Sequence, residues 1–415
     1  MQESEYQRKL KRWQWRILLA FGLLYFFYYF GRENIGFIIP LLRKEGNWSS
    51  AQLGMVSSAL FWTYALGQLF WGRLSDKVGG RLLCALGGLL SMGLNWICSF
   101  ATSAMALAIS WGLNGLAQSM GWAPGNRLIA NWWPPKQRGC AIGVVLSFTG
   151  VAVIAVWLFS SWIGTVQGWK GLFRIPVLPL GIMSVLYLVL VRDSPQQAGL
   201  LEEKESPRLK GEEESPKAGG FLPYLNLLRD YRFDLACLTA GAANFARYSF
   251  TVWIPLYYSE VGGLSLKKLA LVCCAFPAGM AIGPSVAGWI SDRFFRAKRY
   301  PVIAIFLSIS ATSTFILGFV SSLRLIVGGI LLFFVGFCVY GLQGPIYALS
   351  ADVAGRGQAG TAAGIMDSAS YMVGALQGMI IGAILTSSGG NWRTVFALVA
   401  AVQLAGVAIA CRIKR

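Results

Sequence analysis

The chain has 415 residues, of which 55% are hydrophobic and 13% are charged, and it contains no histidine. This composition excludes an ordinary soluble protein of the same size. The lack of histidine excludes catalytic, zinc-binding and proton-relay sites that use this residue. The formal net charge of +18 would suggest a nucleic-acid partner in a soluble protein, but in a membrane protein the positive-inside rule accounts for it. We therefore expect a lipid bilayer around the chain and no nucleic-acid partner.

Apolar runs of about 20 residues or more recur along the chain, and each is long enough to span about 30 Å of hydrocarbon. In order they cover about residues 15–42, 50–71, 82–101, 104–132, 140–164, 171–191, 233–258, 265–290, 300–320, 325–349, 361–387 and 393–411. The polar segment 192–232 between the sixth and seventh runs has the composition of a solvated linker. The pattern predicts an all-α polytopic membrane protein with twelve transmembrane helices. We expect a six-helix bundle over 1–191, a cytoplasmic linker over 192–232 and a second six-helix bundle over 233–415.

The distribution of lysine and arginine predicts how these helices are oriented. If all twelve runs span the membrane and the N-terminus is cytoplasmic, the inside segments carry about 25 of the 36 Lys and Arg residues, and the outside segments about eight. The positive-inside rule describes such a bias. Both termini and the linker are therefore expected in the cytoplasm.

Two features recur in both halves of the chain at nearly the same separation. The sequence Gly-Arg-Leu-Ser-Asp-Lys around Asp76 follows the second run, and Gly-Trp-Ile-Ser-Asp-Arg around Asp292 follows the eighth, 216 residues later. Arg32 in the first run and Arg247 in the seventh are 215 residues apart. Because unrelated features share one offset, we infer a duplicated six-helix unit in parallel orientation. The binding site is then expected between the halves, near the middle of the membrane.

The paired arginines are the strongest candidates for this site. A charged residue at the bilayer centre costs at least about 2.5–3.5 kcal/mol, so it is kept only where it faces water, a partner or a ligand. On a continuous helix, Tyr25, Tyr28 and Tyr29 precede Arg32 by one or two turns and share its face. The alternative is a structural arginine whose guanidinium is satisfied by carbonyl groups of neighbouring helices.

The loop from Gly72 to Arg81, Gly-x-x-x-Asp-Lys-x-Gly-x-Arg, resembles the signature between helices 2 and 3 of the major facilitator superfamily. Within it, the chain is similar to the organophosphate:phosphate antiporter family of glycerol-3-phosphate and hexose-6-phosphate transporters. The stretches that carry this similarity are Tyr28-Tyr29-x-x-Arg32-x-Asn34 with Pro40, Gly121-Trp122-Ala-Pro124 with Asn131-Trp132-Trp133, Arg192-Asp193-Ser-Pro195 with Gly199-Leu200, and Arg247-Tyr248 with Trp253-x-Pro255. The resemblance implies that Arg32 and Arg247 bind the substrate phosphate. Guanidinium suits this role because it stays charged when buried and donates two parallel hydrogen bonds to phosphate oxygens.

The sequence departs from this family at two positions of the expected cavity. Gln68 stands where the glycerol-3-phosphate carriers have a lysine on helix 2, and Thr149 where they have a histidine on helix 5. We therefore expect a less basic cavity, whose substrate does not follow directly from those carriers. Five tyrosines are further candidates for substrate binding: Tyr25, Tyr29, Tyr64, Tyr340 and Tyr371. For Tyr340 and Tyr371, a single interhelical hydrogen bond is the alternative interpretation.

Two acidic residues also lie within apolar runs. Asp367, in the eleventh run, is expected either to pair with an intramembrane arginine or to act as a protonatable or cation-binding coupling group. Glu33 lies about 100° around a helix from Arg32 and is expected to pair elsewhere. Charges in the loops are expected to form cytoplasmic ion pairs that hold the halves together in the outward-open state, and these gate residues are Asp76, Arg81, Arg138 and Asp292.

These features together predict a secondary transporter that works by alternating access. We expect it to exchange a phosphorylated small organic anion for inorganic phosphate, as a monomer in a bacterial inner membrane. The alternatives are a proton- or cation-coupled symporter of organic carboxylates, which Asp367 would favour, and a non-transporting sensor of sugar phosphates. We expect no enzymatic activity, cofactor or metal site, because the sequence offers no nucleophile–base pair or metal cluster, and its eight cysteines occur in no CxxC spacing.

Overall fold

The computed structural model describes residues 2–46, 48–200, 229–295, 299–320, 324–354 and 359–413. The first half of the chain contains α1 (Gln2–Phe30), α2 (Ile35–Glu45), α3 (Ser50–Val78), α4 (Gly80–Cys98), α5 (Ala104–Gln118), α6 (Trp122–Trp132), α7 (Pro135–Arg174), α8 (Leu178–Leu190) and the short helix η1 (Gln196–Ala198). The second half contains α10 (Tyr231–Glu260), α11 (Leu266–Cys273), α12 (Ala275–Phe294), α13 (Arg299–Leu317), α14 (Leu325–Gly341), α15 (Gln343–Ala354), α16 (Ala359–Ser387) and α17 (Trp392–Arg412). Every described regular element is helical, which confirms the expected all-α class.

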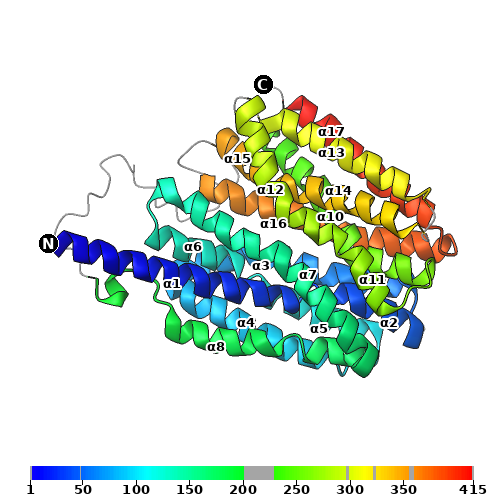
Figure 1. The fold of residues 1–415 in the computed structure, drawn as a ribbon, viewed down its shortest axis with the longest axis horizontal. Helices are drawn as coiled ribbons and strands as arrows, with labels where there is room; N and C mark the ends of the chain where they lie inside the picture. The colour runs from blue at the N-terminus through cyan, green and yellow to red at the C-terminus, as the bar shows by residue number, and fades with distance from the viewer. Residues whose placement is uncertain are drawn as a thin grey trace.

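The described helices group into the twelve expected crossings. Four crossings consist of two helices in succession: α1 with α2, α5 with α6, α11 with α12, and α14 with α15. In α7, Gly168 has a φ of 61°, so the chain turns back there and the sixth crossing continues into α8. Figure 1 shows helices α1–α8 together in one half of the molecule and α10–α17 in the other, with most helix axes running along its length.

Local signals in the sequence set several helix ends. Ser49 caps α3 in a capping box with Gln52, in which each side chain accepts a hydrogen bond from the backbone N–H of the other. The Asp230 side chain caps α10, and the Asn391 side chain caps α17. Between α3 and α4, only Gly79 separates the two helices, and its φ of 91° is a conformation that favours glycine. The signature loop is therefore a tight turn.

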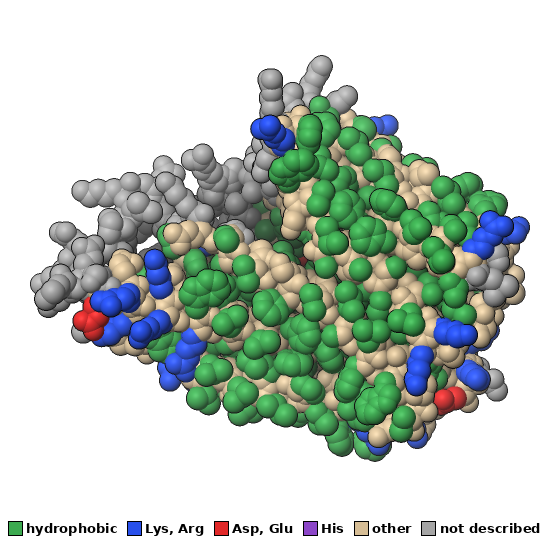
Figure 2. All heavy atoms as spheres, in the orientation of Figure 1, with side chains coloured by type: hydrophobic (Ala, Val, Ile, Leu, Met, Phe, Trp, Pro, Cys, Tyr) green, Lys and Arg blue, Asp and Glu red, His purple; other side chains and the backbone are tan. Residues whose placement is uncertain are grey.

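The surface has the pattern of a membrane protein. Figure 2 shows hydrophobic side chains across the middle of the molecule, with most Lys and Arg side chains toward its two ends. Eight helical segments of the described chain are long and apolar enough to cross a membrane, and one of them, Cys140–Leu190, holds two crossings. The three remaining crossings are α1–α2, α5–α6 and α10. Two of these three carry the intramembrane arginines, whose charge lowers the hydropathy of the segment.

The two ends of the bundle differ in how the halves meet. One end of the bundle holds the Gly79 turn and Arg192, and we call it the linker end. Helices α2 and α10 end at the opposite end, which we call the far end. At the far end, Arg43 Nε lies 3.1 Å from Glu260 Oε1 and joins α2 to α10. This ion pair links the two halves of the chain directly.

Helices α3 and α16 also close the far end. Ser58 Oγ on α3 donates to the carbonyl of Ala375 on α16 at 2.6 Å. The two backbones approach so closely that a Cβ added to Gly54 would lie 2.9 Å from the carbonyl carbon of Gly378. There is no space for a side chain between the helices at this point, so the far end is shut in this structure.

Toward the linker end the halves enclose a cavity of about 980 Å³. Its walls come from α3, α6 and α7 of the first half and from α12, α14, α15 and α16 of the second. The lining residues belong to the halves of these crossings that are nearer the linker end. The structure is therefore closed at the far end and hollow toward the linker end.

Candidate functional site

The first crossing breaks at residues 31–34, between α1 and α2. The sequence pattern predicts a continuous helix here, and the structure corrects this. A break frees backbone carbonyls from helical hydrogen bonds, and such groups need other partners inside a membrane. Asn114 Nδ2 on α5 and Asn95 Nδ2 on α4 both donate to the carbonyl of Gly31, at 2.8 and 3.1 Å. Side chains from two neighbouring crossings thus compensate the break.

The side chains that support the break also bond to one another. Ser91 Oγ donates to Asn114 Oδ1 at 2.6 Å and accepts from Gln118 Nε2 at 2.8 Å. Asn34 Nδ2 donates to Asn95 Oδ1 at 3.2 Å. All five side chains are buried. We call Asn34, Ser91, Asn95, Asn114 and Gln118 the amide network, and it fixes the bend of the chain that carries Arg32.

Arg32 is buried at this break, with 4% of its surface exposed. Its guanidinium carbon lies 4.1 Å from the ring centre of Tyr29 and 5.6 Å from that of Tyr64 on α3, distances typical of cation–π contacts. Among the described residues, its Nε and Nη2 have no hydrogen-bond partner. Because buried polar groups are nearly always bonded, these N–H groups mark a place where an anion would bind.

Arg247 faces the same centre from the unbroken helix α10, with 5% of its surface exposed. Its guanidinium carbon lies 4.7 Å from the ring centre of Tyr340 on α14 and 4.9 Å from that of Tyr248. Its Nη2 donates to the hydroxyl of Tyr29 at 3.4 Å, and its Nε has no hydrogen-bond partner in the described chain. Tyr29 therefore contacts both arginines, one through its ring and one through its hydroxyl.

The other predicted tyrosines surround this pair. Tyr371 on α16 stacks on Tyr64 with ring centres 4.5 Å apart, and it also lies 5.5 Å from the ring of Tyr248. Tyr25 packs edge-on against Tyr29 at 5.7 Å. The structure thus brings the tyrosine candidates from both halves into one aromatic cluster around the arginines.

Thr149 joins this cluster from α7. Its Oγ1 lies 2.7 Å from the hydroxyl of Tyr340, across the boundary between the halves. The Thr149 hydroxyl donates its own proton to the carbonyl of Leu146 at 2.7 Å, so the hydroxyl of Tyr340 is the donor in the pair. Thr149 is therefore an acceptor that orients the ring beneath Arg247.

Asp367 on α16 is buried and forms hydrogen bonds instead of the ion pair that was one of its two expected roles. Gln68 Nε2 on α3 donates to Oδ2 at 3.0 Å, and the hydroxyl of Tyr347 on α15 donates to Oδ1 at 2.6 Å. None of the ion pairs within the described residues includes Asp367. All three residues line the cavity. Tyr347 was not among the sequence candidates, although it follows Tyr340 by two helical turns.

The expectation that Glu33 pairs away from Arg32 is wrong. Glu33 Oε1 lies 3.5 Å from Arg32 Nε, and both side chains are buried. The argument from helical spacing applies to a continuous helix, whereas these two residues lie at the break. On α7, Trp157 Nε1 donates to the backbone carbonyl of Glu33 at 3.3 Å. The pair therefore depends on a backbone conformation that the spacing does not predict.

The predicted gate residues are only partly described. The side chains of Asp76 and Asp292 lie outside the described residues. Arg81 Nε donates to a carbonyl of α8 at 2.9 Å, and Arg138 Nη2 donates to a carbonyl of α6 at 3.1 Å. Both arginines thus bond within the first half while the linker end is hollow. Ion pairs between the halves in the outward-open state remain a prediction.

The cavity adds residues that the sequence did not single out as candidates. Its volume of about 980 Å³ lies near the upper end of the range usual for small-molecule sites, about 300–1,000 Å³. Tyr340, which lines the cavity and lies against Arg247, connects its wall to the arginine pair. The additional polar and aromatic lining residues are Arg73, Trp122, Asn126, Arg127 and Ser147. Gln343, which the sequence offers as a polar residue within the tenth apolar run, lines the cavity as well.

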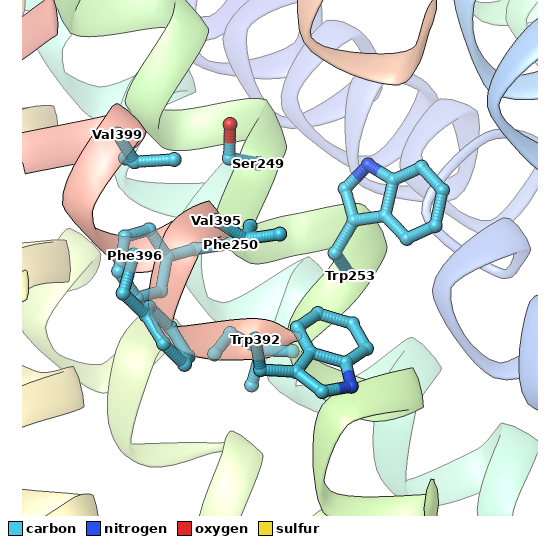
Figure 3. Close-up of a pocket in the computed structure, with 8 residues that line it drawn as sticks. Ser249, Phe250, Trp253, Trp392, Val395, Phe396 and Val399 are labelled. Atoms are coloured by element: carbon cyan, nitrogen blue, oxygen red, sulfur yellow. The ribbon is translucent and has the colours of Figure 1, made fainter. Parts of the chain in front are cut away.

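A second crevice, between α10 and α17, is too small and too apolar to hold an anion. Figure 3 shows Trp253 on α10 and Trp392, Phe396 and Val399 on α17 around it. Its volume is about 10 Å³, which is about the space of a single water molecule by this measure. The central cavity is therefore the candidate site.

Residues 21–376 match the sequence model of the Major Facilitator Superfamily. The chain is similar to the "Probable hexose phosphate transport protein" of Chlamydia pneumoniae, with 29% identity over 96% of this chain and 91% of that protein. It is also similar to the "Glycerol-3-phosphate transporter" of Bacillus subtilis, with 29% identity over 95% of this chain and 90% of that protein. The "Membrane sensor protein UhpC" of Salmonella typhimurium is 26% identical over 96% of this chain and 91% of that protein.

A solved structure shares the fold. The crystal structure of a bacterial homolog to the human lysosomal transporter Spinster, in its inward-facing and occupied conformation, superimposes with a TM-score of 0.79. The two chains are 17% identical, and the match covers 97% of each. This likeness confirms the arrangement of twelve helices in two six-helix bundles.

Proposed function

Because this chain belongs to the Major Facilitator Superfamily, we propose that it is a secondary transporter that exchanges a phosphorylated small organic anion for inorganic phosphate. Relatives named for the transport of hexose phosphate and glycerol 3-phosphate support this substrate class. The main support from the structure is the arginine pair. Two buried guanidiniums from opposite halves face one centre, and each keeps an N–H group without a hydrogen-bond partner among the described residues.

The geometry suits a phosphate group better than a carboxylate. A phosphate dianion offers three terminal oxygens, which accept hydrogen bonds from two guanidiniums at once, and its charge balances two arginines. A carboxylate carries one negative charge and two oxygens. It would leave one of the two arginines, Arg32 or Arg247, incompletely compensated.

The same anion would drive the conformational cycle. Arg32 belongs to the first half and Arg247 to the second, so an anion held by both pulls the two bundles together. In the present structure the far end is shut, and the cavity admits a solute from the linker end. Rocking of the bundles around the bound anion would close the linker end and open the far end, which is alternating access.

The organic part of the substrate would lie in the cavity below the arginines. Gln68, Asp367 and Tyr347 provide an amide, a carboxylate and a hydroxyl on its wall. These groups bond well to the hydroxyls of a sugar or polyol. Gln68 offers no charge for a second anionic group at its own position, so next to the arginine pair a substrate with one phosphate and several hydroxyls fits best.

The orientation completes the proposal. The lysine and arginine bias supports an orientation with the linker end, both termini and the 192–232 linker in the cytoplasm. The present state is then inward-open, and the protein works as a monomer in the inner membrane of a bacterium. Asp76 and Asp292 would act in the other state, in ion pairs that hold the linker end shut.

Counterflow of labelled phosphate tests the proposal. Proteoliposomes loaded with unlabelled phosphate should accumulate labelled phosphate from outside, and external substrate should inhibit this uptake. The test panel comprises glycerol 3-phosphate, a hexose 6-phosphate, a phosphoglycerate and the matching compounds without phosphate. Competition by phosphorylated compounds alone supports the proposal. Competition by a carboxylate without phosphate would contradict it.

Two other functions predict different results in the same vesicles. A proton- or cation-coupled symporter of carboxylates, which the buried Asp367 would suit, accumulates substrate against an imposed gradient without internal phosphate. The similarity to the membrane sensor protein favours a sensor as the second alternative. A sensor would bind a sugar phosphate but show no counterflow of labelled phosphate. If vesicles that contain the protein exchange phosphate faster than vesicles without protein, neither symport of carboxylates nor sensing can be the only activity of the protein.

A further inference from the structure

The two arginines of the site differ in their acidic neighbours. Arg32 has a buried acid beside it, because Glu33 Oε1 lies 3.5 Å from its Nε. Arg247, at the equivalent place in the second half, is followed by Tyr248, and none of the ion pairs in the described chain includes it. The internal repeat accounts for both arginines but not for the acid. Glu33 therefore needs an explanation of its own.

The charge of the buried centre suggests this explanation. Among the described residues around it, Arg32 and Arg247 are cationic and Glu33 and Asp367 are acidic, so with all four ionised the centre is neutral. Adding a phosphate dianion would leave two uncompensated negative charges inside the membrane, which is strongly unfavourable. Glu33 also occupies the side of Arg32 that a phosphate oxygen would approach.

We infer that Glu33 is a proton-coupled counter-ion, which shields Arg32 in the empty site and takes up one proton when a phosphate dianion displaces it. This inference rests on the proposed function. In the exchange, Arg32 loses its contact with the carboxylate and gains a phosphate oxygen. The Glu33 carboxylate forms an O–H bond with a proton from the cavity water. Each bound anion then carries one proton with it through the cycle.

The surroundings of Glu33 suit such an exchange. The 3.5 Å contact with Arg32 is longer than a charge-assisted hydrogen bond, which measures about 2.7–2.9 Å, so it is loose enough to be replaced. Tyr29 and Arg32 on its own crossing, and Arg247 on α10, interact electrostatically with Glu33. From α7, Trp157 bonds the backbone carbonyl and not the carboxylate. An arriving phosphate thus competes for both arginines that now stabilise the ionised form of Glu33.

Two other sources of a linked proton have to be separated from Glu33. Asp367 is the second buried acid, but two hydrogen bonds from Gln68 and Tyr347 already stabilise its ionised form. The ligand could instead bind as its monoanion and supply the site for the proton itself. Variants of the two acids distinguish these cases, because each variant removes one carboxyl group and leaves the proton site of the ligand unchanged.

Isothermal titration calorimetry of the purified protein at pH 8 provides the test, with glucose 6-phosphate and glycerol 3-phosphate as probes. The second pKa of such phosphate monoesters is about 6, so both are dianions at pH 8. The slope of the binding enthalpy against the ionisation enthalpy of the buffer counts the protons taken up, because the buffer releases each proton that the complex binds. We expect about one proton for the parent protein, about none for Glu33→Gln, and about one again for Glu33→Asp and Asp367→Asn.

Affinity measured against pH provides an independent result from the same variants. Where Glu33 is ionised in the free protein, one linked proton changes the affinity about tenfold per pH unit. The ratio of the Kd of the parent to that of Glu33→Gln should therefore rise about tenfold per unit from pH 7 to 8.5. Ionisation of the ligand affects both proteins equally and cancels in this ratio.

Each outcome of these titrations decides the inference. If Glu33→Gln takes up the same number of protons as the parent, or if its affinity follows the same pH curve, the role of Glu33 is refuted. Loss of uptake in Asp367→Asn would move the proton to that residue. If Glu33→Gln does not fold, proton uptake by the parent remains decisive, because a value of zero refutes the inference. Absence of phosphate binding in the parent refutes the proposed function itself, whereas binding without uptake refutes only this inference.

Discussion

Replacement of Gly54 by valine should shift the protein away from the state seen here. At the far end, the backbones of α3 and α16 meet at Gly54 and Gly378. A Cβ at position 54 would lie 2.9 Å from the carbonyl carbon of Gly378, and still closer to its oxygen. Carbon atoms in contact prefer about 3.5–4.0 Å, so the helices would have to separate by roughly 0.6 Å or more. The obstacle is backbone, which cannot rotate away as a side chain can.

The size of the shift follows from the cost of overpacking. Inserting atoms into a well-packed contact costs about 1–3 kcal/mol, and here the cost applies only when the far end is shut. The ratio of protein with the far end shut to protein with the far end open should therefore fall roughly 5- to 150-fold. Gly93→Val on α4 is the matched control, because nothing lies within 4 Å of a Cβ added at Gly93.

Cysteine accessibility measures the shift. Ser147 lines the cavity, and Ser57 is buried at the contact between α3 and α16. In the Gly54→Val protein, Ser147→Cys should react more slowly with a maleimide applied at the linker end. Ser57→Cys should become reactive from the far end. Unchanged reactivity at both positions, with Gly93→Val behaving like the parent, would show that this contact does not hold the far end shut.

Three further predictions concern the interior and the orientation. Asn114→Leu should lower the free energy of unfolding by about 1–3 kcal/mol, because it weakens the support of the Gly31 carbonyl, and equal thermal unfolding temperatures would contradict this. Asp367→Asn should express and unfold like the parent, because the amide oxygen still accepts a hydrogen bond from Gln68. If Asp367 carries the coupling proton, this variant should lose gradient-driven accumulation of substrate but keep exchange, and unchanged accumulation would exclude that role. A cysteine at position 206, which lies outside the described residues, should not react with an impermeant reagent applied to intact cells, and labelling there would overturn the proposed orientation.

The global fold and the centre of the site could be predicted from the sequence. Arg32 and Arg247 share one offset with the two signature loops, and a charge in an apolar run has few physical explanations. Tyr29 follows from its spacing to Arg32 along the first run, whereas Tyr64 and Tyr340 are candidates only as tyrosines within other apolar runs. The structure places all of these residues in one cluster. Spacing within one run is enough for Tyr29, but the contacts of Tyr64 and Tyr340 with the arginines result from the packing of several helices.

The partners of the acidic residues could not be predicted in this way. Glu33 meets Arg32 only because the first crossing breaks at 31–34, and the break is supported by side chains from α4 and α5. Nothing within the first run itself signals that its carbonyls will be bonded from outside. Similarly, the hydrogen bonds of Asp367 come from helices that precede it by 20 and 299 residues. Periodicity describes one helix at a time, whereas these contacts depend on how several helices pack.

The most direct test of the two-arginine phosphate site is the binding of phosphate to Arg32→Lys and Arg247→Lys. Each variant keeps a positive charge but loses the planar fork of donors. Arg174→Lys is the control, because Arg174 bonds Ser99 at 2.7 Å and contacts Phe100, outside the central cavity. Loss of charge-assisted hydrogen bonds costs about 1.5–3 kcal/mol, so each site variant should bind phosphate roughly ten- to a hundredfold more weakly. If both monodisperse variants bind and exchange phosphate like the parent and the control, the arginine pair does not hold the phosphate.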